Sequence, residues 1–349
     1  MIALTQLLYE VSEAELSLMM AIVKTGGVQE ALFWAGELHS SGLHDRTWKV
    51  LWYIYYDFYA IHHPSLGQYI QVFHEEYTDI PSLEPLAHAV YNLAIRGPRT
   101  EIFEARIHMQ QHCQLPSRSF KDLTELWTHG TLLEIGAYLR STDVPTSTLI
   151  KSIHFAFPAR CIPPTTHIMV PKEMTILAAV GSARLPPGEH ARTLLMVDAP
   201  EEVIDAMSDI GSFEDTSDYH YLADRRVWGT SKRLGCFQLP RYKLDKPLTE
   251  HLWYHWEYYA CQTPLWRKRF AQYNGIPNPV TLEVDFPNED AEEVFFRTWN
   301  VLPDEQSKRV QELASGQIVM VPYTRWFRET FNKSACITPN NKIVYISEN

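Results

Sequence analysis

The chain has 349 residues, a formal net charge of −11 at pH 7, 45% hydrophobic residues and 21% charged residues. These proportions exclude a largely disordered chain, a coiled-coil rod and a collagen-like chain, and the length is sufficient for two domains. The negative net charge excludes a whole-protein basic field that would hold a polyanion. Aromatic residues reach 12%, which favours thick cores or aromatic contact surfaces.

Five helices are predicted in the first hundred residues, with starts near residues 12, 28, 46, 65 and 83. Apolar residues there recur at the i, i+3, i+4, i+7 spacing of one helix face. Ser12 and Glu15 have the spacing of a capping box, and Gly42 marks a helix end. Short loops make consecutive helices antiparallel neighbours, so the pattern predicts a helical array. The aromatic face that includes Trp52 and Tyr55 is interpreted as core, with a partner-binding groove as the alternative.

Helical patterns continue over residues 100–142, and a proline-rich stretch follows at 158–171. We therefore expect an N-terminal helical array over 1–157, a linker over 158–171 and a second, mainly helical domain over 172–349. Short strands are expected near residues 193–197, 280–286 and 343–347. The predicted fold class is mostly α.

Charge in the second half of the chain is distributed in blocks. Residues 198–224 hold nine acidic residues and no Lys or Arg, residues 225–269 hold ten basic residues against three acidic ones, and residues 281–305 hold eight acidic residues against Arg297. Such blocks set docking specificity more than raw affinity. The order acidic, basic, acidic therefore favours contacts with protein, either within the fold or across an interface.

The basic block is also rich in aromatic residues. Basic side chains interleaved with rings can hold phosphates and stack bases, so nucleic acid or another anion stays open as a ligand. Leu252, Trp256 and Tyr259 lie at helical spacing, however, which indicates that many of the rings are core. We interpret the block as structural or protein-contacting. The partner-binding residues predicted in it are Arg225, Arg226, Arg241, Lys243, Arg267, Lys268 and Arg269.

No local motif for catalysis, a cofactor or a metal is present in the sequence. It contains no P-loop, G-x-G-x-x-G, G-x-S-x-G or H-E-x-x-H pattern, and its five cysteines are scattered without a C-x-x-C pair. His251 and His255 share a predicted helix face and could bind zinc, but no third ligand can be named. We expect no catalytic residue, cofactor or metal, and the sequence favours a non-enzymatic protein. An enzyme whose site is not local in sequence stays open.

The start of the chain lacks the basic region of a secretory signal, and no run of about 18 uncharged apolar residues predicts a membrane span. Scattered cysteines favour free thiols in a reducing compartment. These observations predict an intracellular protein without a membrane span.

Several stretches of the sequence resemble an uncharacterised family of the nucleocytoplasmic large DNA viruses, the group of giant and algal viruses. The stretches, which span most of the chain, are SLMMAIVK at 17–24, EALFWAGEL at 30–38, Ser41-Gly42, YHWEYYA at 254–260, PLW at 264–266 and LPDEQ at 302–306. The chain departs from the pattern at Gly36 and His39, where larger aromatic residues are expected.

The resemblance implies a virus-encoded protein with no known activity and no catalytic residues to carry over. The expected function is that of a virion-associated or assembly-linked interaction protein, such as a minor capsid or internal structural component. Its expected partners are other viral proteins, and its expected location is the virion, with the host cytoplasm during infection. The alternative is a nucleic-acid-associated accessory factor in viral transcription or replication.

Overall fold

The computed structural model describes residues 2–23, 27–111, 118–165, 169–186, 196–208, 226–228, 254–299, 319–321, 334–337 and 343–346. The protein is mostly helical with a few short strands, as the sequence predicts. Two compact units are each assembled from separate stretches of chain. Unit 1 comprises 1–20, 29–47 and 201–326, and unit 2 comprises 21–28, 48–200 and 327–349. The domain boundaries expected at 157 and 171 stay a prediction.

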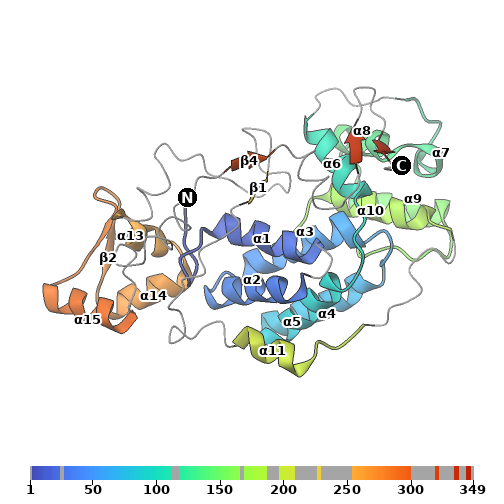
Figure 1. Ribbon diagram of the computed structural model, residues 1–349. Helices are drawn as coiled ribbons and strands as arrows, with labels where there is room; N and C mark the ends of the chain where they lie inside the picture. The colour runs from blue at the N-terminus through green and yellow to red at the C-terminus, as the bar shows by residue number, and fades with distance from the viewer. Residues whose placement is uncertain are drawn as a thin grey trace. The chain divides into compact units, whose positions relative to one another are not determined.

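Unit 1 combines the start of the chain with its later part. Figure 1 shows α13, β2, α14 and α15 of this unit gathered together in orange. The bounds of its elements are α2 Val28–Ser40, α11 Glu201–Ser208, β1 Arg226–Trp228, α13 Trp256–Ala260, α14 Pro264–Gln272, β2 Ile276–Asn278, β3 Glu283–Asp285, α15 Glu289–Trp299 and β4 Val319–Val321. Strands β2 and β3 form an antiparallel hairpin, and β1 and β4 pair in parallel.

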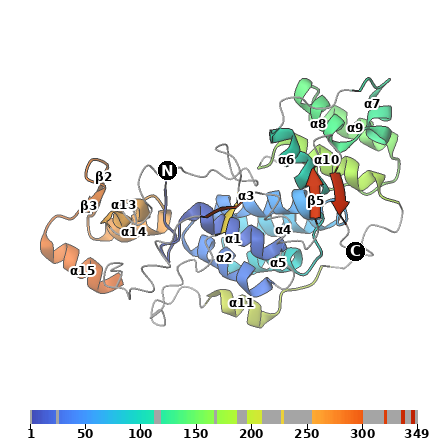
Figure 2. The ribbon, with the colours of Figure 1, turned by 45° about the horizontal axis from the view of Figure 1, so that its top comes forward.

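Unit 2 contains most of the other helices. Helix α10 packs against α6, α8 and α9, and Figure 2 shows these helices close together. The bounds of its elements are η1 Tyr55–Tyr59, α4 Leu66–Asp79, α5 Leu83–Ala94, α6 Glu101–Gln111, α7 Leu123–His129, α8 Leu132–Ser141, α9 Thr146–Ala156, α10 Lys172–Arg184, β5 Ser334–Ile337 and β6 Ile343–Ile346. Two helices continue from one unit into the other, α1 Val11–Val23 and α3 His44–Ile54.

The five predicted helix starts are confirmed, since α1 to α5 begin at residues 11, 28, 44, 66 and 83. The capping box predicted at Ser12 and Glu15 is wrong. Helix α1 begins one residue earlier, the Ser12 hydroxyl donates to Glu10, and the Glu15 carboxylate accepts two hydrogen bonds from Arg46 at 2.6 and 2.9 Å. The Glu15 carboxylate, which would accept a hydrogen bond in a local capping box, instead forms a long-range ion pair with Arg46. Gly42 does end a turn, with a φ of 76°.

Helix α3 continues directly into η1, a single turn of π-helix. The Ala60 N–H donates to the Tyr55 carbonyl at 2.8 Å, five residues back. All five residues of the turn are buried, and Trp52 and Tyr55 are fully enclosed, which confirms the aromatic face as core. Within η1, Asp57 receives both hydrogen bonds of a buried guanidinium fork from Arg106 of α6.

The predicted strands have mixed outcomes. β6 lies within 343–347 and β3 within 280–286, as expected, but the sequence analysis did not identify β1, β2, β4 or β5. Residues 193–195 lie outside the described chain, and residues 196–197 belong to no strand. No helix within the described ranges has the length and apolar character needed to cross a bilayer.

Candidate functional site

The seven basic residues predicted to bind a partner are only partly described. Arg225, Arg241 and Lys243 lie outside the described residues, and of Arg226 only the backbone, in β1, is described. The other three lie together on α14. We therefore build the candidate surface from α14 and the elements packed around it in unit 1.

Helix α14 begins with Pro264 at its first position, where the missing N–H costs no hydrogen bond. Trp266 and Phe270 are four residues apart and face inward, where they are fully buried. They join an aromatic cluster with Trp256 of α13 and Phe295 of α15, whose ring stacks on Phe270 with the centroids 4.3 Å apart. This cluster fixes α14 in the unit and decides which of its bases face outward.

Arg267 and Lys268 are exposed, whereas Arg269 is only 8% exposed. The Arg267 Nε–H donates to the Cys261 carbonyl at 3.3 Å, which anchors the side chain beside the turn between α13 and α14. We call Arg267 and Lys268 the α14 basic pair. The sequence analysis treated the three neighbouring bases alike, but only these two of the three are exposed in the structure.

The Arg269 guanidinium lies between two indole rings. Its central carbon is 4.6 Å from the centroid of Trp266 and 4.0 Å from that of Trp299. Such cation–π contacts gain strength when they are shielded from water. Burial lowers the pKa of Arg269 to about 10, and the negative charge of Glu37 acts in the opposite direction. Arg269 is therefore part of the interior of unit 1, and its predicted place among the partner-binding residues stays a prediction.

Glu37 of α2 is fully buried and holds the first residues of the chain. Its Oε1 accepts a hydrogen bond from the Leu7 N–H at 2.7 Å. The Trp266 Nε1–H donates to the Thr5 carbonyl at 2.8 Å, so the segment 2–10 joins α2 to α14. Burial raises the pKa of Glu37 to about 7, although hydrogen bonds from Thr5 and Leu7 and the charge of Arg269 lower it.

Glu37→Gln is expected to remove a pH dependence of stability. Between about pH 4.5 and 7 the folded protein keeps a proton on Glu37 that the unfolded chain releases, so the free energy of unfolding falls as the pH rises. The glutamine oxygen still accepts from Leu7 but has no such proton. In urea unfolding, the difference in the free energy of unfolding between the variant and the unsubstituted protein should shift in favour of the variant by roughly 1–3 kcal/mol as the pH rises from about 5 to 7.5. A difference that does not vary with pH would contradict this assignment.

His39, also on α2, makes stability depend on pH in the opposite direction. Burial lowers the pKa of His39 to about 4, and the charge of His44, whose ring stacks on it at 5.0 Å, adds to the effect. Between about pH 4 and 6.5, His39 therefore binds fewer protons in the folded protein than in the unfolded chain. The free energy of unfolding consequently falls as the pH falls from about 6.5 towards 4. Comparing the Glu37 variant with the unsubstituted protein at each pH cancels the His39 contribution.

The other elements that pack on this aromatic cluster have two further surface features. The β2–β3 hairpin exposes two large aliphatic side chains, Ile276 at 67% and Val280 at 89%. Helix α15 exposes acidic side chains: Glu289, Asp290, Glu292 and Glu293. The apolar hairpin, the basic pair and the acidic helix therefore belong to elements that pack on the same aromatic cluster. The sequence analysis missed the hairpin side chains, because an exposed Ile and Val near prolines carry no distinguishing local pattern.

The described residues contain no group of three or more His, Cys, Asp or Glu side chains placed to hold a metal ion. His251 lies outside the described residues, and His255 precedes the first turn of α13. Comparison of the chain with protein-family models, curated proteins and solved structures gives no match.

Proposed function

We propose that this protein is a non-enzymatic interaction protein and that the α14 basic pair with the β2–β3 hairpin forms its docking surface. The observation that carries the proposal is that three consecutive bases differ in burial. Arg269 is enclosed by aromatic rings, while Arg267 and Lys268 are held outward on a helix fixed by the same rings. Interfaces commonly combine rigidly held apolar side chains with charged groups that set specificity.

The charges favour an acidic protein partner over a nucleic acid. A nucleic acid needs a continuous positive surface, because each phosphate contact contributes through charge. Here the basic pair lies on a helix that packs directly against α15, and α15 exposes four carboxylates. These carboxylates repel a phosphate backbone. With the resemblance to a family of large DNA viruses, the proposed partners are other viral proteins in the virion or its assembly.

Arg267→Glu combined with Lys268→Glu is expected to weaken partner binding more than tenfold, because like charges placed opposite each other at an interface cost several kcal/mol. The fold should be unaffected, since both side chains are exposed. The measurement is recovery of partner proteins with the tagged chain from infected cells, together with its presence in purified particles. A matched control reverses two exposed lysines of α3 and α9, Lys49→Glu and Lys151→Glu.

The nucleic-acid alternative is tested with a short duplex between about 50 and 200 mM salt, where phosphate contacts weaken steeply. Tight, salt-sensitive binding that the Arg267 and Lys268 reversals abolish would overturn the proposal in favour of the accessory-factor function. Equal recovery of partners by the reversed and control variants would show that the docking surface lies elsewhere.

A further inference from the structure

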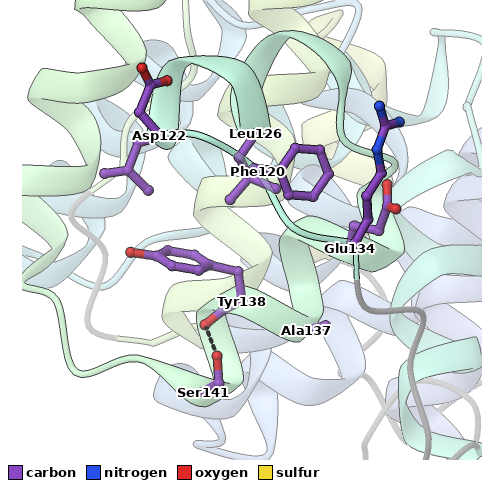
Figure 3. A pocket seen from close by; sticks show the side chains of 9 residues that line it. Phe120, Asp122, Leu126, Glu134, Ala137, Tyr138 and Ser141 are labelled. Carbon is purple, nitrogen blue, oxygen red and sulfur yellow. Dashed lines mark hydrogen bonds between the residues drawn. The ribbon is translucent and has the colours of Figure 1, made fainter.

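A pocket of about 520 Å³ lies in unit 2 beside α7 and α8, but its charged side chains already have partners within the fold. Asp122 and Glu134, whose carboxylates flank the Phe120 ring in Figure 3, each accept a hydrogen bond at a helix start. The Arg118 guanidinium lies over the Phe120 ring, 5.5 Å from its centroid. These charges therefore select no ligand, and we turn to α5 of the same unit.

The segment 197–199, which we call the strap, is held on α5 by two side chains one helical turn apart. Asn92 Nδ2 donates to the Val197 carbonyl at 2.7 Å, and the Val197 N–H donates to Asn92 Oδ1 at 3.1 Å. The Ala199 N–H donates to His88 Nδ1 at 2.9 Å. Val197 and Asp198 are exposed and only the small Ala199 is buried, so these main-chain hydrogen bonds carry much of the attachment.

Asn92 is the anchor that does not respond to pH. It is fully buried, and its amide orientation is fixed because Oδ1 also accepts from Arg96 Nη1 at 2.9 Å. Its Nδ2 donates in addition to the His88 carbonyl at 2.8 Å. An amide side chain has no proton to gain or lose near neutral pH, so its two hydrogen bonds to Val197 are the same in acid.

His88 is the anchor that titrates. A backbone N–H can only donate, so Nδ1 must carry a lone pair, and the proton of the neutral ring is then on Nε2. Nε2 lies 3.8 Å from Glu84 Oε1, which is the charged group that the described residues place against the ring. From α4 the ring faces the uncharged Phe73, with the centroids 5.4 Å apart.

Protonation of His88 is incompatible with this arrangement. Both nitrogens of an imidazolium are donors, so an Nδ1–H would point at the Ala199 N–H and the hydrogen bond would be lost. The Glu84 carboxylate favours the charged ring through Nε2. The bound strap therefore requires a neutral His88, and a proton favours the released strap.

We propose that His88 is a pH-sensitive latch, which holds the strap on α5 while its ring is neutral and releases the strap when the ring is protonated. The strap is the last part of unit 2 before the chain enters unit 1 at Glu201. Acidification thus frees this connection from α5.

The test is hydrogen exchange of the full chain, resolved to single amides and expressed as protection factors. The protection of Val197 and Ala199 should fall together by about tenfold between pH 7.5 and 5.5, the change in the neutral fraction of an ordinary histidine over that range. The Val90 amide within α5 should keep its protection. An unchanged Ala199 amide overturns the latch, and a fall confined to Ala199 overturns release, because Asn92 would still hold the strap.

Two variants of His88 separate the latch from other effects of pH. His88→Asn supplies an oxygen that accepts from Ala199 at any pH, so the strap should stay protected at both pH values. His88→Phe keeps a ring against Phe73 but has no acceptor, so protection should be low at both. A tenfold pH response in His88→Asn, or full protection in His88→Phe, overturns the proposal.

His154→Asn is the matched control, because His154 is an exposed histidine of α9. It should show the same tenfold response as the unsubstituted protein. Loss of the response in this control would show that the pH dependence does not come from His88 and would overturn the assignment. Circular dichroism of all three variants should match that of the unsubstituted protein, since His88 is partly exposed at the surface of α5.

Discussion

Arg106→Met is expected to lower the free energy of unfolding by about 3–5 kcal/mol, the usual cost of removing one partner from a buried ion pair. The side chains of Arg106 and Asp57 are 5% and 0% exposed, and the Arg106 Nε–H donates to Asp57 Oδ1 at 3.0 Å. Burial raises the pKa of Asp57, while the charge and hydrogen bonds of Arg106 lower it. Without Arg106 the Asp57 carboxylate would remain in the core with no compensating charge. Urea unfolding followed by tryptophan fluorescence measures the loss.

The double variant Asp57→Leu with Arg106→Met separates the ion pair from simple packing. Because apolar residues of similar volume can replace a buried pair at little cost, the double variant should recover most of the stability lost in Arg106→Met. The Arg106 guanidinium also lies within 6.0 Å of the Tyr53 ring and 5.8 Å of the Phe103 ring, and methionine keeps part of that contact. A loss below about 1 kcal/mol in the single variant would mean that Asp57 finds another partner.

Trp52→Ala is expected to cost about 3–5 kcal/mol as well, by loss of buried area and creation of a cavity. Trp52 is fully buried in unit 2, and its Nε1–H donates to His74 Nδ1 at 3.2 Å. Its ring also lies 5.8 Å from the rings of Tyr55 and Tyr56. The same unfolding measurement applies, and a variant that cannot be recovered in soluble form agrees with the expectation.

Tyr69→Ala is the control, because Tyr69 is 43% exposed on α4 and its loss should change stability by less than about 0.5 kcal/mol. Trp52→Phe keeps most of the ring volume and should retain much more stability than Trp52→Ala. An unchanged midpoint in Trp52→Ala would refute the assignment of this face to the core.

Helix periodicity was sufficient to locate α1 to α5 because burial of one face repeats every turn and leaves its mark on nearby residues. The starts at 28 and 83 are found to the residue. The π-turn at Tyr55–Tyr59 could not be found in this way. Its five residues have the apolar and aromatic character of an ordinary helix face, and the ion pair of Asp57 with Arg106 of α6 is a long-range contact that leaves no local pattern.

The candidate surface was only half predictable for the same reason. The sequence shows three consecutive bases, and the i, i+3, i+4 spacing places Arg269 on the helix face of Trp266 and Phe270. That spacing does not show which other elements enclose the guanidinium. Arg269 is enclosed because Trp266 lies one turn before it and Trp299 comes from another helix. Glu37, which acts on Arg269, lies in the first part of the chain. Such long-range pairs leave no local pattern.

The burial of residues 2–10 against α14 also bears on the order of events during synthesis. Thr5 accepts its hydrogen bond from Trp266, and Leu4 donates to the Tyr259 carbonyl at 3.3 Å. At roughly 5–20 residues per second, a ribosome needs on the order of 10–50 s to make the intervening chain. Throughout that interval the apolar start of the protein has α2 but not α13 or α14 as native cover, so this segment is a natural target for chaperones on the nascent chain. Slowing translation between residues 20 and 254 should lower the soluble yield.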